Sequence, residues 1–469
     1  MDLSKLTIAQ ARKDLDAKMY SALDLTNAYL ENIRAKDKDI HAYLEVWEES
    51  ARDEAKRADE LIAAGRSLPL TGIPLAIKDN ILIEGRIASA ASKMLENYRA
   101  SYNATVIQKL REQGAVFLGR TNMDEFALGS STENSAFGPT HNPHDLSRVP
   151  GGTSGGSTAA VAADLALGAL GSDTGGSLRQ PAAFCGVIGF KPTYGEVSRF
   201  GLMAAASSLD QIGAAAKTID DAEILFNAIR GHDPKDSTSL PDARLSMKKP
   251  RTIGVPRAFL KEGIEPDILA AFEATLEQLK KAGYSIVDID LPTLQYALAV
   301  YYIINPAEVS TNLARYDGIR YGLSVDAPSI GEVYAKSKAA GFGPETRRRI
   351  LVGTFVLSSG YADAYYRKAR AVRELIREDF VRAFKTVDVI AIPTSPIAPW
   401  KIGEKADPLS NYAADIFTVP LNLAGLPGMS VPSGSVTRDG KELPVGFQII
   451  ASHRGETALF ATGKDIENE

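Results

Sequence analysis

The hydroxyl groups of two glycine-rich segments are the residues of this chain with the clearest potential for chemistry. The first segment reads Gly151-Gly-Thr-Ser-Gly-Gly-Ser157, and the second reads Gly171-Ser-Asp-Thr-Gly-Gly-Ser177. Glycines beside a hydroxyl residue allow a positive φ and let a substrate approach the backbone N–H groups. We therefore expect a nucleophilic hydroxyl next to an oxyanion hole, with a phosphate-binding loop as the alternative.

Ser177 is the candidate nucleophile. Its segment follows the apolar run 165–170 and precedes a helix-like sequence, so a strand, a tight turn and a helix start are expected in that order. The start of a helix favours negative charge. We predict that the backbone N–H groups of Thr174, Gly175 and Gly176 form the oxyanion hole.

The first glycine-rich segment is expected to support the second. It matches the pattern Gly-x-Ser-x-Gly of a hydrolase nucleophile elbow, but that motif requires a preceding strand. Residues 141–150 are rich in turn-forming residues instead. The segment is therefore predicted to present the hydroxyls of Thr153 and Ser154 toward the second segment.

Lys78 is the candidate general base. It ends the apolar run Pro74-Leu-Ala-Ile-Lys78, where a lysine either reaches solvent or is desolvated. Burial would lower its pKa toward neutrality and let the amine take a proton from a hydroxyl. Of the five histidines only His141 and His144 are three residues apart, and the Asn-Pro turn between them disfavours a shared metal ion, so we expect a lysine base and no metal site.

Composition excludes several other classes of protein. The 469 residues carry a net charge of −5, which disfavours a broad basic face that would bind nucleic acid directly. The single cysteine, Cys185, excludes an internal disulfide and is expected to be buried as a small apolar residue. No segment is apolar and long enough to span a membrane, and the N-terminus does not resemble a secretory signal, so we expect a cytoplasmic protein.

The order of elements predicts an α/β fold. We expect one domain, a three-layer α/β/α arrangement around a central mixed sheet, divided into a helical lead-in (1–65), a core (66–220) and a remainder with further strands and substrate-binding elements (250–452). Segment 231–249 is either a linker or a surface loop. Helices are predicted at 103–113, 265–282 and 344–385, and strands at 73–77, 80–83, 115–119, 165–170, 252–256, 284–290, 387–393, 428–432 and 444–450.

The two glycine-rich segments, Ile77-Lys-Asp-Asn80 and Gly189-Phe-Lys-Pro-Thr193 together resemble the amidase signature family over nearly the whole chain. The resemblance implies a catalytic triad with Ser177 as the acylated nucleophile and Lys78 as the base. Between them stands a residue after a cis peptide bond, 24 positions before the nucleophile, where the family has serine and this chain has Thr153. Threonine keeps the hydroxyl but adds a methyl group, which restricts the χ1 angle. Ser154 is the alternative relay.

Segments 305–322, 357–361 and 415–425 resemble those family members that hydrolyse glutamine within tRNA-dependent amidotransferases. The resemblance implies that Arg348 binds the α-carboxylate of glutamine and that Asp415 binds its ammonium group. Tyr302, or its neighbour Tyr301, and Ser154 are expected to line the same pocket. Opposite charges at the two ends would provide the recognition of a free amino acid.

The resemblance also implies partners. Ammonia would pass to a second protein chain, within a heterotrimer with subunits B and C, and that chain would use ATP and Mg²⁺ to amidate glutamate or aspartate on a misacylated tRNA. This chain itself would hold no cofactor and would meet tRNA only through its partner. Two alternatives stay open at this point: an amidase of small amides that acts alone, and a catalytically silent scaffold.

Overall fold

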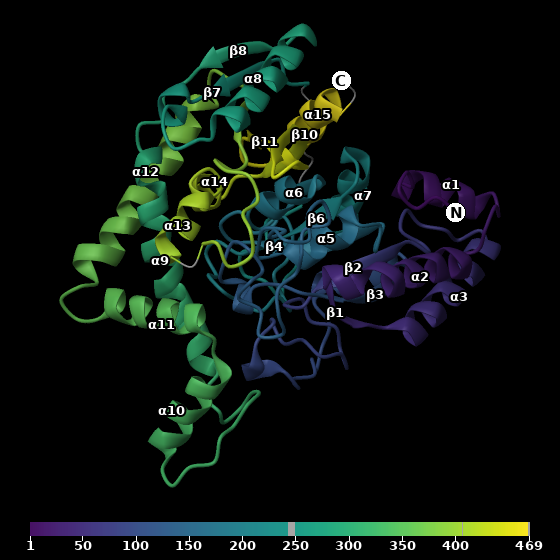
Figure 1. Cartoon of the computed structure of the whole chain (residues 1–469), viewed down its shortest axis with the longest axis horizontal. Helices are drawn as coiled ribbons and strands as arrows, with labels where there is room; N and C mark the ends of the chain where they lie inside the picture. The colour runs from purple at the N-terminus through teal and green to yellow at the C-terminus, as the bar shows by residue number, and fades with distance from the viewer. Residues whose placement is uncertain (243–248, 406, 468–469) are drawn as a thin grey trace.

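The chain folds around one mixed sheet (Figure 1). The computed structural model describes residues 1–242, 249–405 and 407–467, so part of the candidate linker 231–249 lies outside the described residues. Within this part the sheet has eleven strands. Their spatial order is β1 (Tyr43–Val46), β3 (Val116–Thr121), β2 (Pro74–Lys78), β4 (Gly168–Asp173), β6 (Gln211–Ala216), β5 (Ile188–Lys191), β10 (Gly428–Arg438), β11 (Lys441–Ala451), β9 (Val389–Pro393), β7 (Thr252–Val255) and β8 (Ser285–Asp288).

Parallel and antiparallel pairs both occur in this sheet. Strand β2 pairs in parallel with β3 and β4, and β7 pairs in parallel with β8 and β9, whereas β4, β6, β5, β10, β11 and β9 form successive antiparallel pairs. Every residue of β2, β4, β6 and β9 is buried, which requires cover on both faces of the sheet. The predicted α/β fold with a central mixed sheet is confirmed.

Helices surround the sheet, some against its faces and some apart from it. They are α1 (Ile8–Asp16), α2 (Ala22–Ile40), α3 (Glu48–Ala63), α4 (Thr105–Glu112), α5 (Gly155–Ala162), α6 (Arg179–Cys185), α7 (Ile219–Ile229), α8 (Pro266–Lys281), α9 (Ala297–Asn312), α10 (Ile330–Gly341), α11 (Pro344–Leu357), α12 (Lys368–Ala383), α13 (Pro408–Tyr412), α14 (Val419–Ala424) and α15 (Glu456–Glu467). Helix α2 begins with a capping box, in which Ser21 accepts from the Asp24 N–H and Asp24 accepts from the Ser21 N–H. No described helix is long and apolar enough to cross a membrane.

Three predicted elements differ from the structure. The helical lead-in is interrupted by β1, because His41 ends α2 in the left-handed conformation and the β-forming residues after it pair with β3. Residues 80–83 form no strand; Ile81 makes only an isolated bridge to Leu202. The long helix predicted over 344–385 is divided into α11 and α12, since Ser358 takes an extended conformation after Leu357 and Gly360 then takes a φ of +86°.

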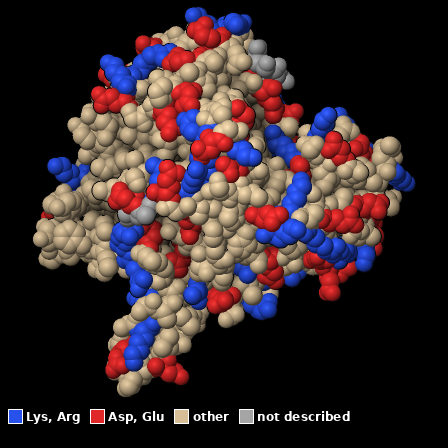
Figure 2. Space-filling view, viewed as in Figure 1, with Lys and Arg blue, Asp and Glu red and all other residues tan. Residues whose placement is uncertain are grey.

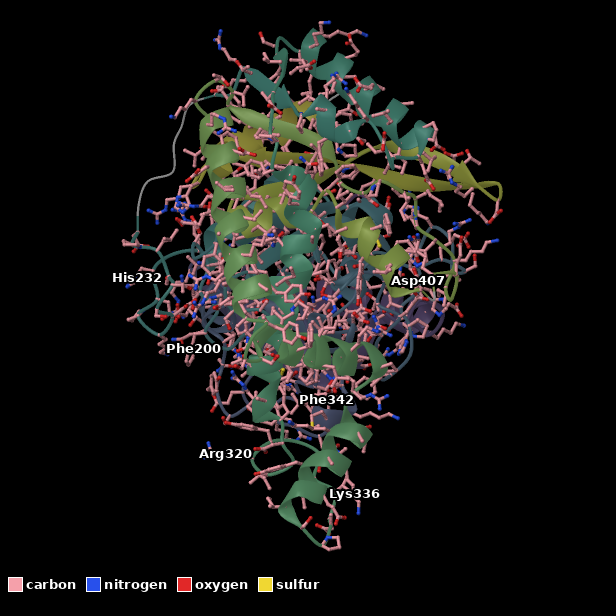
Figure 3. All side chains as sticks on the ribbon, turned by 90° about the vertical axis from the view of Figure 1, so that its left-hand side faces the viewer. Phe200, His232, Arg320, Lys336, Phe342 and Asp407 are labelled. Atoms are coloured by element: carbon pink, nitrogen blue, oxygen red, sulfur yellow. The ribbon has the colours of Figure 1, made fainter. Side chains whose placement is uncertain are left out.

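Two parts of the molecule stand apart from the sheet in Figure 1. Helices α9, α11 and α12 lie at the left of the view, and α10 extends below them as an arm. Figure 3 shows Arg320 and Lys336 on this arm and Phe342 where the arm joins the body. Phe342 packs on Phe126 with ring centres 5.7 Å apart, which attaches the arm next to the segment that leads into the candidate site.

Candidate active site

Lys78 occupies the end of β2, in the middle of the first half of the sheet. Its side chain is fully buried, so the alternative of a lysine that reaches solvent is excluded. The amine donates to Thr153 Oγ1 at 2.7 Å, Ser154 Oγ at 2.8 Å and Ser172 Oγ at 2.9 Å. Burial lowers the pKa of Lys78 to about 7, and none of the carboxylates that oppose this shift bonds to the amine directly. Lys78 can therefore exchange a proton near neutral pH.

The first glycine-rich segment supplies two of these hydroxyls. The Gly152–Thr153 peptide bond is cis, as the resemblance implies, and α5 begins directly after Ser154. The Gly152 N–H donates to Gln180 Oε1 at 2.9 Å. A Cβ at Gly152 would lie 2.2 Å from the Asp124 carboxylate, so only glycine fits there. The segment is thus held in place from two sides.

The second segment places Ser177 between β4 and α6. Ser177 is 7% exposed, and the Ser154 N–H donates to the Ser177 carbonyl oxygen at 2.9 Å, so the two glycine-rich segments are in direct contact. Among the described residues, no hydrogen bond joins the Ser177 hydroxyl to Thr153 or Lys78. The structure therefore brings Lys78, Thr153 and Ser154 into direct contact and joins Ser177 to them through its backbone.

The three N–H groups predicted as oxyanion donors differ in their partners. The Gly176 N–H donates to Asp173 Oδ1 at 3.0 Å. Within the described part of the chain, the N–H groups of Thr174 and Gly175 have no acceptor. The Tyr301 ring covers Gly175 so closely that a Cβ there would lie 2.6 Å from it. The geometry thus leaves Thr174 and Gly175 free to hold an anion, while Gly176 shapes the turn.

A fully buried ion pair fixes this turn. Asp173 accepts from Arg179 Nε at 3.0 Å and from Arg179 Nη2 at 2.9 Å, and neither side chain is exposed. Asn422 Nδ2 donates to the same carboxylate at 2.9 Å. Burial alone would raise the pKa of Asp173, but Arg179 and the hydrogen bonds hold that pKa well below its usual range.

A cavity of about 280 Å³ opens beside these elements, and Ser130, Arg348 and Tyr412 are among its lining residues. Arg348 is 44% exposed and forms an ion pair with Glu345. Tyr302 and Asp415 do not line this cavity but lie behind Ser130, whose hydroxyl donates to Asp415 Oδ1 at 2.9 Å. Of the predicted substrate residues, Arg348 therefore lines the cavity and Tyr302 and Asp415 lie behind it, whereas Ser154, like Lys78 and Ser177, is not among the lining residues.

Asp415 is a buried carboxylate without an ion-pair partner among the described residues. The Tyr302 hydroxyl donates to Asp415 Oδ2 at 2.8 Å, which distinguishes the role of Tyr302 from that of Tyr301. Burial raises the pKa of Asp415 to about 7, because removal from water disfavours the anion. An ammonium group placed here would stabilise the charged form.

Several residues that contact this region were not predicted from the sequence. Arg349, rather than its neighbour Arg348, is buried, and its guanidinium lies 4.7 Å from the ring centres of both Tyr302 and Tyr412. Ser172 had no predicted role, yet its hydroxyl accepts from Lys78 and from Asn80 Nδ2 at 2.9 Å each. The one available signal was the position of Asn80, two residues after Lys78.

No group of three or more His, Cys, Asp or Glu side chains in the described residues could hold a metal ion. Cys185 is buried, and burial raises the pKa of its thiol to about 12. This thiol therefore stays protonated at neutral pH and is inert as a nucleophile.

Comparison with known proteins identifies the family. The amidase family model matches residues 24–460. The A subunit of glutamyl-tRNA(Gln) amidotransferase from Thermoanaerobacter pseudethanolicus is 54% identical over 465 residues, which cover 97% of this chain and 94% of the relative. The protein of the same name from Desulfosudis oleivorans is 51% identical over 477 residues, covering 100% and 98%.

Solved structures agree with this result. The crystal structure of the A subunit of glutamyl-tRNA(Gln) amidotransferase from Thermotoga maritima is 40% identical, with a TM-score of 0.82, and the match covers 100% of this chain and 96% of that one. A 6-aminohexanoate cyclic dimer hydrolase is 26% identical, with a TM-score of 0.84, and covers 100% and 97%. The chain belongs to the amidase family.

Proposed function

We propose that this chain is the glutaminase subunit of a tRNA-dependent amidotransferase. One observation carries the proposal: the buried amine of Lys78 contacts three hydroxyls, and burial brings its pKa to about 7. A neutral amine at this position can act as a general base toward a serine nucleophile. The relatives named for glutamyl-tRNA(Gln) amidotransferase support glutamine as the substrate.

The first half of the reaction forms an acyl-enzyme. Lys78 draws a proton through the Thr153 hydroxyl from Ser177, whose oxygen attacks the side-chain amide carbon of glutamine. The N–H groups of Thr174 and Gly175 hold the oxyanion. The proton on Lys78 then passes back to the leaving nitrogen, the C–N bond breaks, and ammonia departs while glutamyl remains esterified to Ser177.

The second half releases glutamate. Water attacks the ester, its proton travels along the same hydroxyl to Lys78, and the returning proton restores the Ser177 hydroxyl. Asp415 would hold the α-ammonium group of the substrate and Arg348 its α-carboxylate, so both ends of a free amino acid are bound by opposite charge. Tyr302 orients Asp415 through its hydroxyl.

Thr153, rather than Ser154, is the better relay. A hydroxyl that passes a proton must donate to the base while it accepts from the nucleophile. Ser154 Oγ already donates to the Ser172 carbonyl oxygen at 3.0 Å. The Thr153 hydroxyl has no such acceptor among the described residues, so its proton is free to move toward Lys78.

The proposal includes partners. In the heterotrimer with subunits B and C, the ammonia passes to a partner that uses ATP and Mg²⁺ to amidate glutamate or aspartate on misacylated tRNA in the cytoplasm. The relatives are each named as one component of an amidotransferase, which supports a complex. The net charge of −5 supports a chain that leaves tRNA binding to its partner.

Glutamate release from glutamine tests this function. We expect Ser177→Ala to abolish release by the complex with subunits B and C, and Thr153→Ala to lower kcat by about 10²–10³, which lies within the range of general acid–base catalysis. Thr153→Ser should retain most of the activity, and Ser154→Ala should cost less than Thr153→Ala.

Three outcomes would contradict the proposal. Equal glutamate release by the wild-type and Ser177→Ala complexes would exclude the nucleophile. Hydrolysis of simple amides by the isolated chain, without glutamine hydrolysis in the complex, would favour an amidase that acts alone. A complex that amidates tRNA from free ammonia but never hydrolyses glutamine would show a silent scaffold.

A further inference from the structure

An apolar patch lies exposed on α11 and on the turn that follows it. It consists of Leu351, Val352, Phe355, Tyr361 and Tyr365, which we call the α11 patch. Leu351 is 69% exposed and Phe355 is 47% exposed. The rings of Phe355 and Tyr361 are 4.4 Å apart, so they form one surface. Figure 2 shows a largely uncharged face at its left edge, where Figure 1 places the turn between α11 and α12.

The α11 patch begins next to the candidate substrate cavity. Leu351, Val352 and Phe355 follow Arg348 by three, four and seven residues, so the four side chains lie along one stripe of the helix. Arg348 lines the cavity. A molecule that covers this stripe therefore reaches the cavity edge with no element of this chain between them.

Basic residues outnumber acidic ones in the segment that carries the α11 patch. Residues 344–385 contain ten Lys or Arg and five Asp or Glu, a net charge of +5, whereas the whole chain carries −5. Arg347, Lys368 and Arg370 are exposed at its border. An occupant with an apolar centre and an acidic border would complement this surface in both respects.

We propose that the α11 patch is the surface on which the partner protein of the amidotransferase docks, through an apolar face bordered by acidic residues. The inference rests on the proposed function, which makes this chain one component of a complex. Soluble monomers rarely expose aliphatic and aromatic side chains together in a continuous patch, and such patches mark interaction sites. Leucine, valine and phenylalanine at the centre match a protein partner better than a phosphate backbone, which is recognised by cations. Docking at this position brings the partner protein to the edge of the cavity that Arg348 lines.

Co-purification of the full chain with its cognate subunits B and C tests this surface. We expect the double substitution Leu351→Glu and Phe355→Glu to lower the amount of co-purified partner at least tenfold, because it puts two charges into the centre of an apolar interface. Leu68→Glu is the matched control, since Leu68 is 44% exposed outside the patch, between α3 and β2. It should leave assembly unchanged, and melting temperatures show that each variant is folded.

A charge reversal tests the border separately. We expect Lys368→Glu with Arg370→Glu to weaken assembly about threefold at low salt, with the difference shrinking as salt rises, because exposed charges are screened.

The outcomes separate this inference from the function on which it rests. Normal assembly by the Leu351→Glu/Phe355→Glu chain, with wild-type glutaminase activity, would reject the surface and leave the function standing. Failure of the wild-type chain to assemble would reject both. A variant complex that assembles but loses tRNA binding, or a wild-type homodimer that the double substitution dissociates, would also reject the partner protein as the occupant.

Discussion

Two buried polar centres, one around Lys78 and one around Arg179, differ in how their charges are paired. Each contains one of two consecutive residues of β4. Ser172 joins the hydroxyl centre around Lys78, and Asp173 joins the ion-pair centre around Arg179. Successive side chains of a strand point to opposite faces, which keeps the two centres apart. In the first centre the cation contacts only hydroxyls and a carbonyl; in the second, guanidinium and carboxylate bond directly. The buried amine of Lys78, without a bonded carboxylate, can titrate near neutral pH, whereas the carboxylate of Asp173 holds its charge beside Arg179 and serves the structure.

Lys191 shows that burial alone does not produce a base. Burial lowers its pKa to about 7, as for Lys78. Its amine donates to the carbonyl oxygen of Pro192 at 2.9 Å, and no described hydroxyl contacts it. A proton accepted by Lys191 therefore has no relay to a nucleophile. What distinguishes Lys78 is the set of hydroxyls that the two glycine-rich segments provide.

The largest expected effect comes from replacing these two lysines in parallel. Lys78→Met should lower kcat for glutamine hydrolysis by about 10⁴, or about 5 kcal/mol of transition-state stabilisation, since the base is removed. Lys191→Met should lower it by less than about tenfold, because this lysine has no relay. Initial rates of glutamate release, with melting curves for both variants, measure the contrast. Equal losses would mean that the hydroxyl centre is not what makes Lys78 a base.

The next effect concerns stability. Arg179→Met leaves Asp173 as an unpaired buried charge and should lower the free energy of unfolding by about 3–5 kcal/mol. Arg34→Met, at the exposed pair with Glu48, should lower the free energy of unfolding far less, because solvent and salt screen an exposed pair. Urea denaturation of both variants measures the difference. A similar small cost in both would show that the ion-pair centre is not what holds the turn before Ser177.

The sequence predicts the hydroxyl centre around Lys78 better than the ion-pair centre around Arg179. The glycines and hydroxyls of the second segment indicate Ser177, the apolar run that ends at Lys78 indicates Lys78, and the resemblance to the amidase signature family implies Thr153. Of the partners of Asp173, Arg179 is six residues away, whereas Asn422 comes from α14, and no local pattern indicates that distant contact. Tertiary contacts of this kind also decide which of two adjacent arginines is buried.

The strands of the fold were also predicted unequally, because local patterns indicate some of them and tertiary pairing decides the others. The strands β2, β3 and β9 are short apolar runs and were predicted within a few residues. Strand β1 was missed because its four residues continue the apolar pattern of the helices on both sides, and only pairing with β3 makes them a strand. Strands β5 and β6 were not predicted either, although their residues are buried. The break between α11 and α12 begins with the extended Ser358 and includes a positive φ at Gly360, and the surrounding helical pattern indicates neither.

The smallest effect is a pH dependence that separates Lys78 from Asp415. Burial lowers the pKa of Lys78 to about 7 and raises the pKa of Asp415 to about 7. Below pH 7, protonation of Lys78 removes the base, and protonation of Asp415 removes the anion that binds ammonium. Both protonations therefore lower activity as the pH falls.

The two groups are distinguished by which kinetic constant they affect. Bound ammonium keeps Asp415 charged, so kcat at saturating glutamine should fall about tenfold per pH unit below 7, through Lys78 alone. The value of kcat/KM reports the free enzyme and should fall more steeply, toward a hundredfold per unit well below both pKa values. Asp415→Asn should return that slope to tenfold and raise KM.

A kcat that stays constant between pH 5 and 8 would contradict a titrating lysine base, whereas an unchanged kcat/KM slope in Asp415→Asn would contradict only the role of Asp415. The profile of kcat therefore tests the unpaired amine, and the profile of kcat/KM tests the unpaired carboxylate.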